Sequence, residues 1–344
     1  MDGNNSNNKI DLITEQIFEE VVQEYEKKLN KNSPLFVVIG GVPGSGKTTI
    51  TKRLQKQLIL YFKKRENNNI NDEETIQYVS KNNDTNIELL NRITDNITDN
   101  TTIPSQELLH DIVYNTDVKN YKSYKLLKYD DDSGLPFYSI KSIGGDKTSI
   151  EVHLPAKTES SNKQSPVATV PMDGFHIPLA ILAKYANPKE ALFKRGHFET
   201  FDSKNYLNFI KLILQSSNEA MIVKYPGFNH EDKDPVQNAY QLKLTPQNEL
   251  KICIFEGLYN LFNEENYGSS IVEEFEKNKK DHLSFFFDSD DKVLEDRVSK
   301  RHLDSGIVNT IDDGIQRFRD NDLKNALLVR KNLVKDPKMK VIFT

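Results

Sequence analysis

The sequence lacks the features that cross-link, anchor or export a protein. Its 344 residues include one cysteine, Cys253, and no tryptophan, so an internal disulfide is excluded and a reducing compartment is expected. No apolar run is long enough to cross a bilayer, and the first residues, MDGNNSNNKIDL, contain neither a signal-peptide core nor the arginine bias of a transit peptide. We therefore expect a soluble, cytoplasmic protein without a membrane span.

Positive charge is also scarce relative to negative charge. The net charge is -5, so the chain as a whole has no excess of positive charge that would attract nucleic acid, and no nucleic-acid partner is expected. The apolar fraction is only 37%, which is low for a globular chain, so part of the sequence must be unusually polar. The length favours one large domain or a core that carries an insert.

The first 63 residues have the pattern of a helix, a strand and a second helix. Apolar residues at every fourth position predict a helix from Asp11 to Leu29, and LFVVIG from Leu35 to Gly40 has the composition of a strand buried on both faces. A glycine-rich loop and another amphipathic stretch follow. The apolar positions of the two helices are Ile13, Ile17, Val21, Tyr25 and Leu29, then Ile50, Leu54, Leu58 and Tyr61.

Residues 64–166 contain the polar excess. They are rich in asparagine, aspartate and threonine, and we predict that they form an inserted subdomain, since a structureless connection of this length is unusual in a compact domain. YKLLKY, LPFYSIKSI and TSIEVHL are expected strands of a small antiparallel layer, and SQELLHDIVYN is an expected helix. A protein partner at this insert is a further hypothesis.

Residues 167–344 return to the pattern of a core. Apolar runs at 167–172, 251–255, 283–288 and 340–343 alternate with helix-like stretches. This alternation predicts an α/β fold with a parallel sheet whose ligand lies at the carboxyl ends of the strands. The domain organisation predicted is thus 1–63 and 167–344 as the core and 64–166 as the insert.

One motif gives a nucleotide site directly. The sequence GVPGSGKT satisfies G-x-x-x-x-G-K-[ST] after an apolar strand and before a helix, the context that a P-loop requires. Its backbone N–H groups would cradle phosphates, Lys47 would reach the β- and γ-phosphates, and the Thr48 hydroxyl would bind Mg²⁺. The alternative is a glycine-rich turn without a ligand. The predicted ATP-binding residues are Gly41, Val42, Pro43, Gly44, Ser45, Gly46, Lys47, Thr48 and Thr49.

Two acids follow other apolar runs. Glu256 ends ICIFE, where a parallel strand would place a carboxylate beside the Mg²⁺ shell, although an acid at a strand end next to a turn glycine is the alternative. Asp173 follows VATVPM, where a base would accept the proton of an acceptor hydroxyl. As an Asp-Gly pair alone it favours a turn, and its position after a predicted strand favours the catalytic interpretation.

Two arginines follow the fourth core strand. Arg297 and Arg301 are four residues apart in LEDRVSKRH and share a face if the segment is helical. They could neutralise charge on a triphosphate, or they could form a solvated basic face paired with Glu295 and Asp296.

These motifs together carry a resemblance. GVPGSGKTT, VPMDGFH, KRGHFETFD, YPGFNHEDKDP, IFEGLY, EDRVSKRHLDSGIV and NDLKNA occur in this order. The set resembles the uridine kinase-like branch of P-loop kinases, with uridine kinase, phosphoribulokinase and prokaryotic-type pantothenate kinase. It is most similar to less characterised fungal and bacterial kinase-like members with an M-D-G-F-H motif. The resemblance covers roughly residues 35–62 and 167–344.

The resemblance implies a five-stranded parallel sheet in the order 2-3-1-4-5, with ATP and Mg²⁺ as cofactors. It implies that Asp173 serves as the base, that Glu256 supports Mg²⁺ and that Arg297 and Arg301 contact phosphates. The implied contacts of a small-molecule acceptor are His176, Arg195, Tyr225 and His230, and Asn325 is placed near the adenine. The long insert and His197-Phe198 depart from the family pattern, so the acceptor is expected to differ from those of relatives.

Two other functions compete with a kinase that phosphorylates a nucleoside, a pantothenate-like or a sugar-like hydroxyl. NKKD, Asn278 to Asp281, fits the guanine motif of a switch GTPase, but it precedes an apolar strand instead of following one. A catalytically weak ATP-binding scaffold or ATPase is the second alternative, against which the presence of Lys47, Thr48, Asp173 and Glu256 argues.

Overall fold

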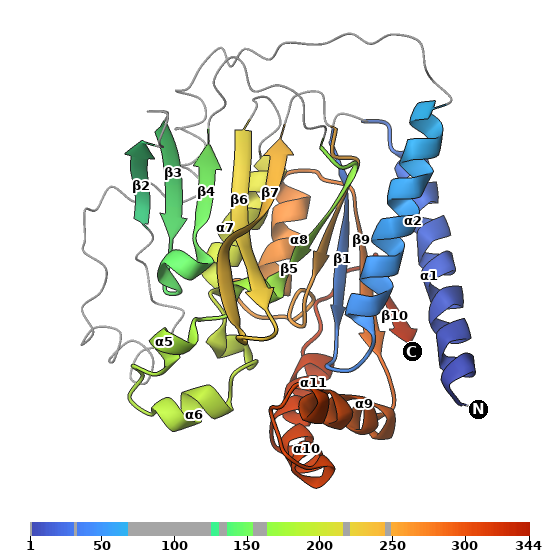
Figure 1. The fold of residues 1–344 in the computed structure, drawn as a ribbon. Helices are drawn as coiled ribbons and strands as arrows, with labels where there is room; N and C mark the ends of the chain where they lie inside the picture. The colour runs from blue at the N-terminus through green and yellow to red at the C-terminus, as the bar shows by residue number, and fades with distance from the viewer. Residues whose placement is uncertain are drawn as a thin grey trace. The chain divides into compact units, whose positions relative to one another are not determined.

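The computed structural model describes residues 2–30, 33–67, 125–130, 136–153, 164–215, 221–244 and 249–344 (Figure 1). The chain divides into two compact units. The first unit comprises Met1–Ile76, Lys163–Pro171 and Gln247–Thr344, and the second comprises Gln77–Asn162 and Met172–Pro246. The predicted partition at residues 63 and 166 stays a prediction, as does a partner for the insert, most of which lies outside the described residues.

A five-stranded parallel sheet forms the centre of the first unit. Its order is β10-β9-β1-β8-β5, and all four neighbouring pairs are parallel. Counted along the chain from the β5 edge, this is the predicted order 2-3-1-4-5, which is confirmed. The strands are β1 (Leu35–Gly41), β5 (Val167–Pro171), β8 (Ile252–Glu256), β9 (His282–Asp288) and β10 (Met339–Phe343).

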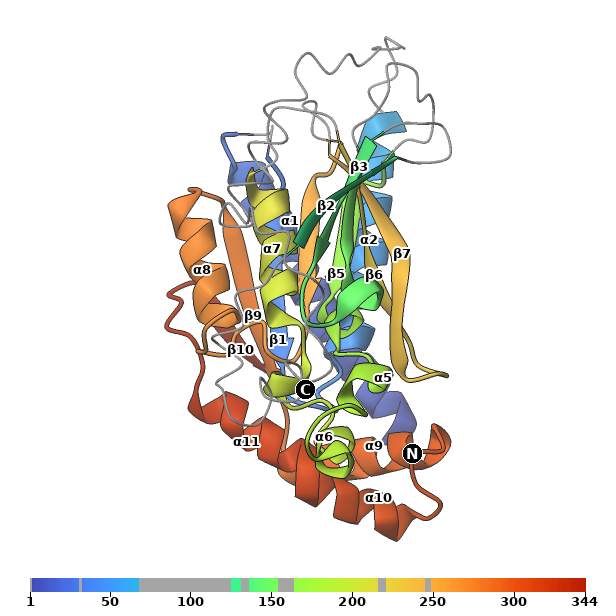
Figure 2. The same ribbon diagram turned by 90° about the vertical axis from the view of Figure 1, so that its left-hand side faces the viewer.

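Helices cover both faces of this sheet because alternate residues of the central strand point to opposite faces (Figure 2). Leu35, Val37 and Ile39 of β1 pack with α1 (Asp2–Lys27) and α2 (Lys47–Asn67) in one buried cluster. Phe36 points the other way and contacts Phe275 of α8 (Gly268–Lys277) at a ring-centroid distance of 5.4 Å.

The two N-terminal helices use the predicted apolar faces with one exception. Ile13, Ile17, Val21 and Tyr25 of α1 are buried, and Ile50, Leu54 and Leu58 of α2 are fully buried. The expectation that Leu29 extends this face is wrong, because α1 ends at Lys27 and Leu29 is fully exposed. Among the described helices, none is both long and apolar enough to span a membrane.

A helical segment lies between β9 and β10 and contains a π-helical turn. It comprises α9 (Asp291–Asp304), α10 (Ile311–Arg317), the π-turn η5 (Phe318–Asp322) and α11 (Leu323–Lys331). Gly314 of α10 lies so close to α9 that a Cβ there would approach the Ser299 carbonyl oxygen to 2.8 Å. The glycine therefore permits the tight packing of α10 on α9.

The second unit contains an antiparallel sheet in the order β2-β3-β4-β6-β7. Its first three strands are the three predicted in the insert, whereas the predicted helix SQELLHDIVYN lies outside the described residues. The strands are β2 (Lys125–Asp130), β3 (Pro136–Lys141), β4 (Ile150–His153), β6 (Met221–Asn229) and β7 (Asp234–Leu244). Helix α7 (Ser203–Gln215) covers one face, where Phe209 packs against Tyr225 with ring centroids 4.5 Å apart.

A buried polar network fixes the amino end of β9. Asp336 accepts hydrogen bonds from His282 at 3.3 Å, from the Ser284 hydroxyl at 2.5 Å and from the Lys338 N–H at 2.9 Å. Burial alone disfavours the charged carboxylate, but these donors outweigh it and lower the pKa of Asp336 to about 2. Folding therefore favours the ionised form of Asp336.

The first prediction concerns acid stability. Because the folded-state pKa lies below the ordinary value of 3.8, the stabilisation is complete above about pH 5 and is lost as the pH falls toward 2. We expect Asp336→Asn to lower the free energy of unfolding by about 2 kcal/mol at pH 7, with a deficit roughly halved at pH 3. Urea unfolding at both pH values measures it, with exposed Asp312→Asn as control. A deficit that does not change with pH would contradict the assignment.

Candidate active site

The glycine-rich loop leaves the carboxyl end of the central strand and curls before α2 begins. The Val42 N–H donates to the Phe287 carbonyl oxygen at 3.1 Å, and the Ser45 hydroxyl donates to the Val42 carbonyl oxygen at 2.7 Å. The Lys47 ammonium lies 3.5 Å from the same Val42 oxygen, at the limit of a hydrogen bond. Lys47 therefore folds back over its own loop and starts the helix whose N-terminal N–H groups attract anions.

Gly44 is required both by the backbone and by its neighbour. Its φ of +80° is a conformation that side chains rarely adopt, and a Cβ would approach Val298 Cγ2 of α9 to 2.7 Å. Gly46 has a similar φ of +78°, but a Cβ there would meet no atom within 4 Å. The loop therefore rests on α9 at Gly44 and is open at Gly46.

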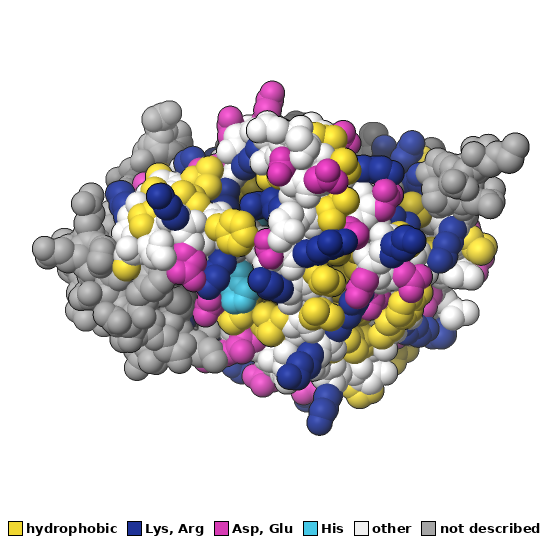
Figure 3. Space-filling view, turned by 90° about the horizontal axis from the view of Figure 1, so that it is seen from below, with side chains coloured by type: hydrophobic (Ala, Val, Ile, Leu, Met, Phe, Trp, Pro, Cys, Tyr) yellow, Lys and Arg dark blue, Asp and Glu magenta, His cyan; other side chains and the backbone are white. Residues whose placement is uncertain are grey.

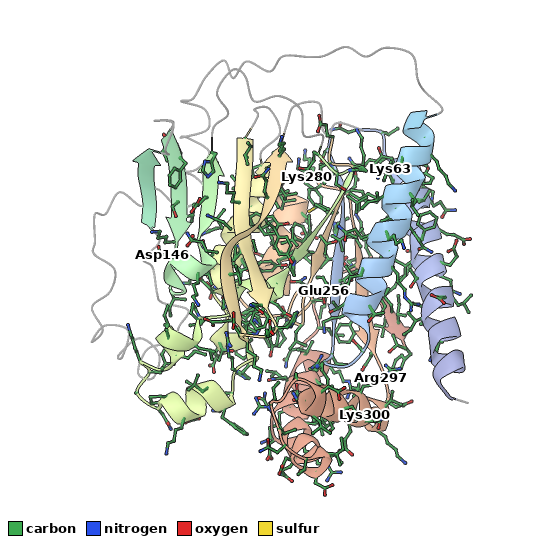
Figure 4. The ribbon with its side chains drawn as sticks, in the orientation of Figure 1. Lys63, Asp146, Glu256, Lys280, Arg297 and Lys300 are labelled. Atoms are coloured by element: carbon green, nitrogen blue, oxygen red, sulfur yellow. The ribbon has the colours of Figure 1, made fainter. Side chains whose placement is uncertain are left out.

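Thr48 and Glu256 meet at the end of two neighbouring strands. The register places Ile39 of β1 beside Glu256 of β8, and the Thr48 hydroxyl donates to Glu256 Oε1 at 3.0 Å. Glu256 is 7% exposed and lies at the lower end of the sheet in Figure 4. Hydroxyl and carboxylate oxygens suit Mg²⁺, which keeps few protein ligands and completes its octahedron with water and phosphate oxygens. The pair fits such an ion, and the described residues contain no cluster of three or more acidic, His or Cys ligands.

The two arginines of α9 differ in what they contact. Arg297 Nη1 donates to the Gly44 carbonyl oxygen at 3.2 Å and to the Thr344 hydroxyl at 3.3 Å, so it holds the outside of the loop. The Arg301 carbonyl oxygen accepts a hydrogen bond from the Ser305 N–H at 3.0 Å, whereas its exposed guanidinium makes no hydrogen bond or ion pair within the described ranges. Figure 4 shows Arg297 and Lys300 on this helix.

The acids beside these arginines have other partners. Glu295 accepts from Arg319 at 2.7 Å, and Asp296 accepts from Lys300 at 2.9 Å. The alternative that Arg297 and Arg301 pair with Glu295 and Asp296 is therefore not the arrangement found. Seen from below, basic and acidic side chains alternate over the exposed surface of the described residues (Figure 3).

Sequence reasoning missed a second acid at the same edge of the sheet. Asp288 ends β9 one residue beyond Phe287, the register partner of Gly41, and is 7% exposed. Arg330 of α11 donates to Asp288 from Nε at 3.0 Å and from Nη2 at 2.8 Å. The signal was the acid at the end of LSFFFD, the same pattern that identified Glu256. Asn325, predicted near the adenine, is buried on α11.

In the second unit, Asp173 lies in a short turn that His176 directly follows. Asp173 belongs to the 3₁₀ turn η3 (Met172–Phe175), and the His176 N–H donates to the Asp173 carbonyl oxygen at 3.2 Å. Side chains three residues apart on such a turn lie on the same face. A Cβ at Gly174 would approach the Pro226 carbonyl oxygen to 2.3 Å, so the Asp-Gly pair also permits η3 to pack on β6.

The His176 ring has a defined tautomer. Its Nδ1 lies 2.8 Å from the Asp173 carbonyl oxygen, which only accepts, so Nδ1 carries the proton. The ring packs between Phe201 and Phe228, with centroids at 3.9 and 4.9 Å. Burial lowers the pKa of His176. The imidazole is therefore neutral near pH 7, and Nε2 is a hydrogen-bond acceptor.

Arg195 is held by the protein itself. It donates to Asp234 Oδ1 at 3.0 Å, to the Ile177 carbonyl oxygen at 3.3 Å and to the Lys233 carbonyl oxygen, and its side chain is 10% exposed. Asp234 also accepts from Lys147 at 2.7 Å. Asp234 was not identified from the sequence, since nothing local distinguishes it from the acids around it.

The remaining predicted acceptor residues lie in different environments. Tyr225 is 3% exposed and packs between Phe209 and Tyr240. His230 is exposed, and its ring contacts Phe228 at a centroid distance of 5.3 Å. The second unit thus brings Asp173, His176 and Arg195 into one region, whereas Tyr225 is part of its packed interior.

The sequence NKKD lies at the wrong edge of the sheet for a guanine site. Asn278 caps α8, and β9 begins at His282, beside Phe36 near the start of β1. The P-loop follows the opposite end of β1. Seven-residue strands separate these edges by about 20 Å.

Comparison with known proteins places the chain among kinases, although no protein-family model matches it. It is 32% identical over 350 residues to ATP-dependent kinase YFH7 of Vanderwaltozyma polyspora, covering 89% of this chain and 92% of that protein. Identity to ATP-dependent kinase YFH7 of Candida glabrata is 30% over 354 residues, covering 94% and 97%. A crystal structure of Saccharomyces cerevisiae YFH7, described as a P-loop kinase with a circular permutation, superposes with a TM-score of 0.70 at 25% identity, covering 96% and 99%.

The second prediction tests the packing contact between Gly44 of the P-loop and Val298 of α9. Gly44→Ala forces a side chain into both an unfavourable φ and the Val298 methyl group, so the loop must shift. We expect ATP affinity, measured by calorimetry, to fall about tenfold or more. Gly306→Ala is the matched control, because Gly306 also has a positive φ, +64°, but no atom within 4 Å. Equal ATP affinity for the two variants would contradict the proposed role of this contact.

Proposed function

The chain belongs to the YFH7 family of ATP-dependent kinases, and we propose that it transfers the γ-phosphoryl group of ATP to a hydroxyl group of a small metabolite. The family membership confirms the resemblance to P-loop kinases of the uridine kinase-like branch. The observation that carries the proposal is the hydrogen bond between Thr48 and Glu256, at the edge of the sheet where β1 and β8 end. Thr48 directly follows Lys47, the lysine of the P-loop motif.

The nucleotide half of the reaction uses residues of the first unit. The backbone N–H groups of Gly44 to Thr48 bind the β-phosphate. The Lys47 ammonium, which lies near the Val42 carbonyl oxygen in this structure, contacts the β- and γ-phosphates when ATP is bound. Thr48 and Glu256, already joined by a hydrogen bond, would hold Mg²⁺. When bound, the ion would neutralise charge on the phosphates of ATP. Arg301 contributes its cation to the triphosphate, and Arg297 keeps the loop in shape.

The acceptor half uses Asp173. Its place in the sequence supports this role, since Asp173 comes two residues after the end of β5, whose last residue, Pro171, is the register partner of Glu256. The carboxylate orients the acceptor hydroxyl and accepts its proton as the oxygen attacks the γ-phosphorus in line. The products are a phosphate monoester and ADP.

His176 and Arg195 support the same step. His176 lies on the Asp173 face of η3, and its Nε2 accepts a hydrogen bond from a second acceptor hydroxyl. Arg195 stabilises this region through Asp234 and the Ile177 carbonyl. Tyr225 supports the sheet beneath, and His230 is the exposed contact at the rim. The candidate acceptors are the nucleoside-like, pantothenate-like or sugar-like alcohols expected from the resemblance to P-loop kinases.

An ATP-binding scaffold or weak ATPase is the second candidate. It is less well supported, because Lys47, Thr48, Glu256 and Asp173 are all present and a dead kinase would be expected to lack at least one. A GTPase is disfavoured by the position of NKKD at the amino end of β9.

The third prediction tests the base. Asp173→Asn keeps the size of the side chain but cannot accept the proton, so turnover should fall by about 10²–10⁴-fold while ATP affinity stays within about twofold. The measurement is coupled ADP release with Mg-ATP across nucleosides, pantothenate, sugars and other small alcohols, plus ATP binding by calorimetry.

Lys47→Ala is the comparison variant. It removes a contact to the phosphates of ATP, so ATP affinity or turnover should fall. Full turnover in Asp173→Asn would overturn the base assignment. An absence of stimulation by every alcohol in the native protein would favour the ATPase.

The fourth prediction tests Mg²⁺. Glu256→Gln retains an oxygen for the Thr48 hydroxyl but removes the charge, so the free Mg²⁺ concentration for half-maximal activity should rise about tenfold or more. Titration of ADP release with Mg²⁺ at fixed ATP measures it. Glu274→Gln, another buried acid of the same unit, is the control. An unaltered Mg²⁺ dependence in Glu256→Gln would exclude Glu256 from the ion's surroundings.

A further inference from the structure

Two of the sequence motifs are joined by a buried histidine–aspartate pair. His302 Nε2 of α9 lies 2.9 Å from Asp322 Oδ2, the last residue of the π-turn η5. The two residues are only 6% and 9% exposed. His302 belongs to EDRVSKRHLDSGIV and Asp322 to NDLKNA, and neither has a role in the reaction described above.

This hydrogen bond is the polar anchor of the His302 ring. The other ring nitrogen, Nδ1, is buried and has no hydrogen-bond partner among the described residues. Nε2 therefore carries the proton and donates it to the Asp322 carboxylate, since a carboxylate of an ionised aspartate only accepts. A hydrogen bond to a charged group in a buried site is stronger than one between neutral groups.

Helix α9 is packed on two sides. One side meets the P-loop, where Val298 and Leu294 lie against Gly44 and Arg297 binds its carbonyl oxygen. The other side meets α10 through Ser299 and η5 through His302. The His302–Asp322 pair thus fixes the last turn of α9, while residues nearer its start contact the P-loop.

Arg301 precedes His302 directly and follows Arg297 by four residues. It therefore lies one turn, about 5–6 Å, farther along the face that meets the P-loop. The exposed guanidinium of Arg301 makes no hydrogen bond within the described residues, so no side-chain contact fixes its position. Its position depends on how α9 is held.

The π-turn that carries Asp322 supports the same conclusion. Such turns are rare and occur frequently at functional sites. Here the π-turn spans Phe318–Asp322 between α10 and α11 and ends at the residue that binds His302. A wider turn at this point places the Asp322 carboxylate against α9.

We propose that His302 and Asp322 are positioning residues that fix α9 so that Arg301 reaches the triphosphate of bound ATP. The proposal rests on the function proposed above for Arg301. His302 itself touches no reacting group and acts through the helix.

A double-mutant cycle tests the proposal. The variants are His302→Ala, Arg301→Ala and the two combined, assayed for kcat and for KM of ATP. We expect His302→Ala to raise KM for ATP about fivefold with a smaller change in kcat, and to have less than a twofold effect when Arg301 is already alanine. Asp322→Ala should reproduce His302→Ala, and His302→Gln, which places an N–H donor near Nε2, should restore most of the affinity.

His282→Ala is the matched control. It removes a second buried histidine–aspartate pair of the same unit, at the amino end of β9. We expect a lower melting temperature without a change in KM for ATP, so a purely structural loss is distinguished from a loss of positioning. Should His302→Ala fail to fold, Asp322→Asn, which keeps the shape of the side chain, replaces it in the cycle.

The outcomes separate this proposal from the function on which it rests. Equal effects of His302→Ala with and without Arg301 would overturn the positioning role while leaving the role of Arg301 intact. No effect of Arg301→Ala on KM or kcat would overturn both. An unchanged KM in His302→Ala would overturn the positioning role alone.

Discussion

The parallel register of β1 with β8 and β9 is the constraint on which the nucleotide site depends. Ile39 lies beside Glu256, and Gly41 lies beside Phe287, so the glycine-rich loop and two carboxylates leave the sheet at one edge. The register follows from burial, because every residue of β1 is enclosed between helices and a slip by one residue would exchange its two faces. Thr48 meets Glu256 as a consequence of this pairing.

The P-loop is also supported from outside. Val298 fills the space that a side chain at Gly44 would need, and Arg297 binds the Gly44 carbonyl. A glycine-rich loop gains no rigidity from its own side chains, so the neighbouring helix has to provide it. One arginine of α9 thus contacts the loop, while the guanidinium of Arg301, one turn away, makes no hydrogen bond to the described residues. The two arginines of a single sequence motif therefore have different surroundings.

In the second unit, too, a glycine permits a close backbone contact while its neighbours carry the polar side chains. Gly174 permits η3 to approach the Pro226 carbonyl, and this approach leaves the Asp173 and His176 side chains on one face of the turn. Thus the turn does not exclude the role proposed for Asp173, since Gly174 makes the close contact with Pro226. Arg195, like Arg297, donates to groups of the protein itself, but only the charge of Arg195 is matched by a carboxylate, that of Asp234.

The P-loop, the three insert strands and the acid at the end of β8 could be predicted from the amino-acid sequence, and the order of the core sheet was implied by the resemblance to P-loop kinases. These features depend on local backbone geometry, on the periodicity of apolar residues and on ordered motifs, which stretches of sequence contain. The pairing of charged groups could not be predicted, because it follows from tertiary packing. Arg330 and Asp288 are 42 residues apart, Arg195 and Asp234 are 39 apart, and His302 and Asp322 are 20 apart. Each of these side chains had several acids or bases nearer in sequence, and packing of the helices selected the partner because a buried charge is stable only beside the group that packing brings to it.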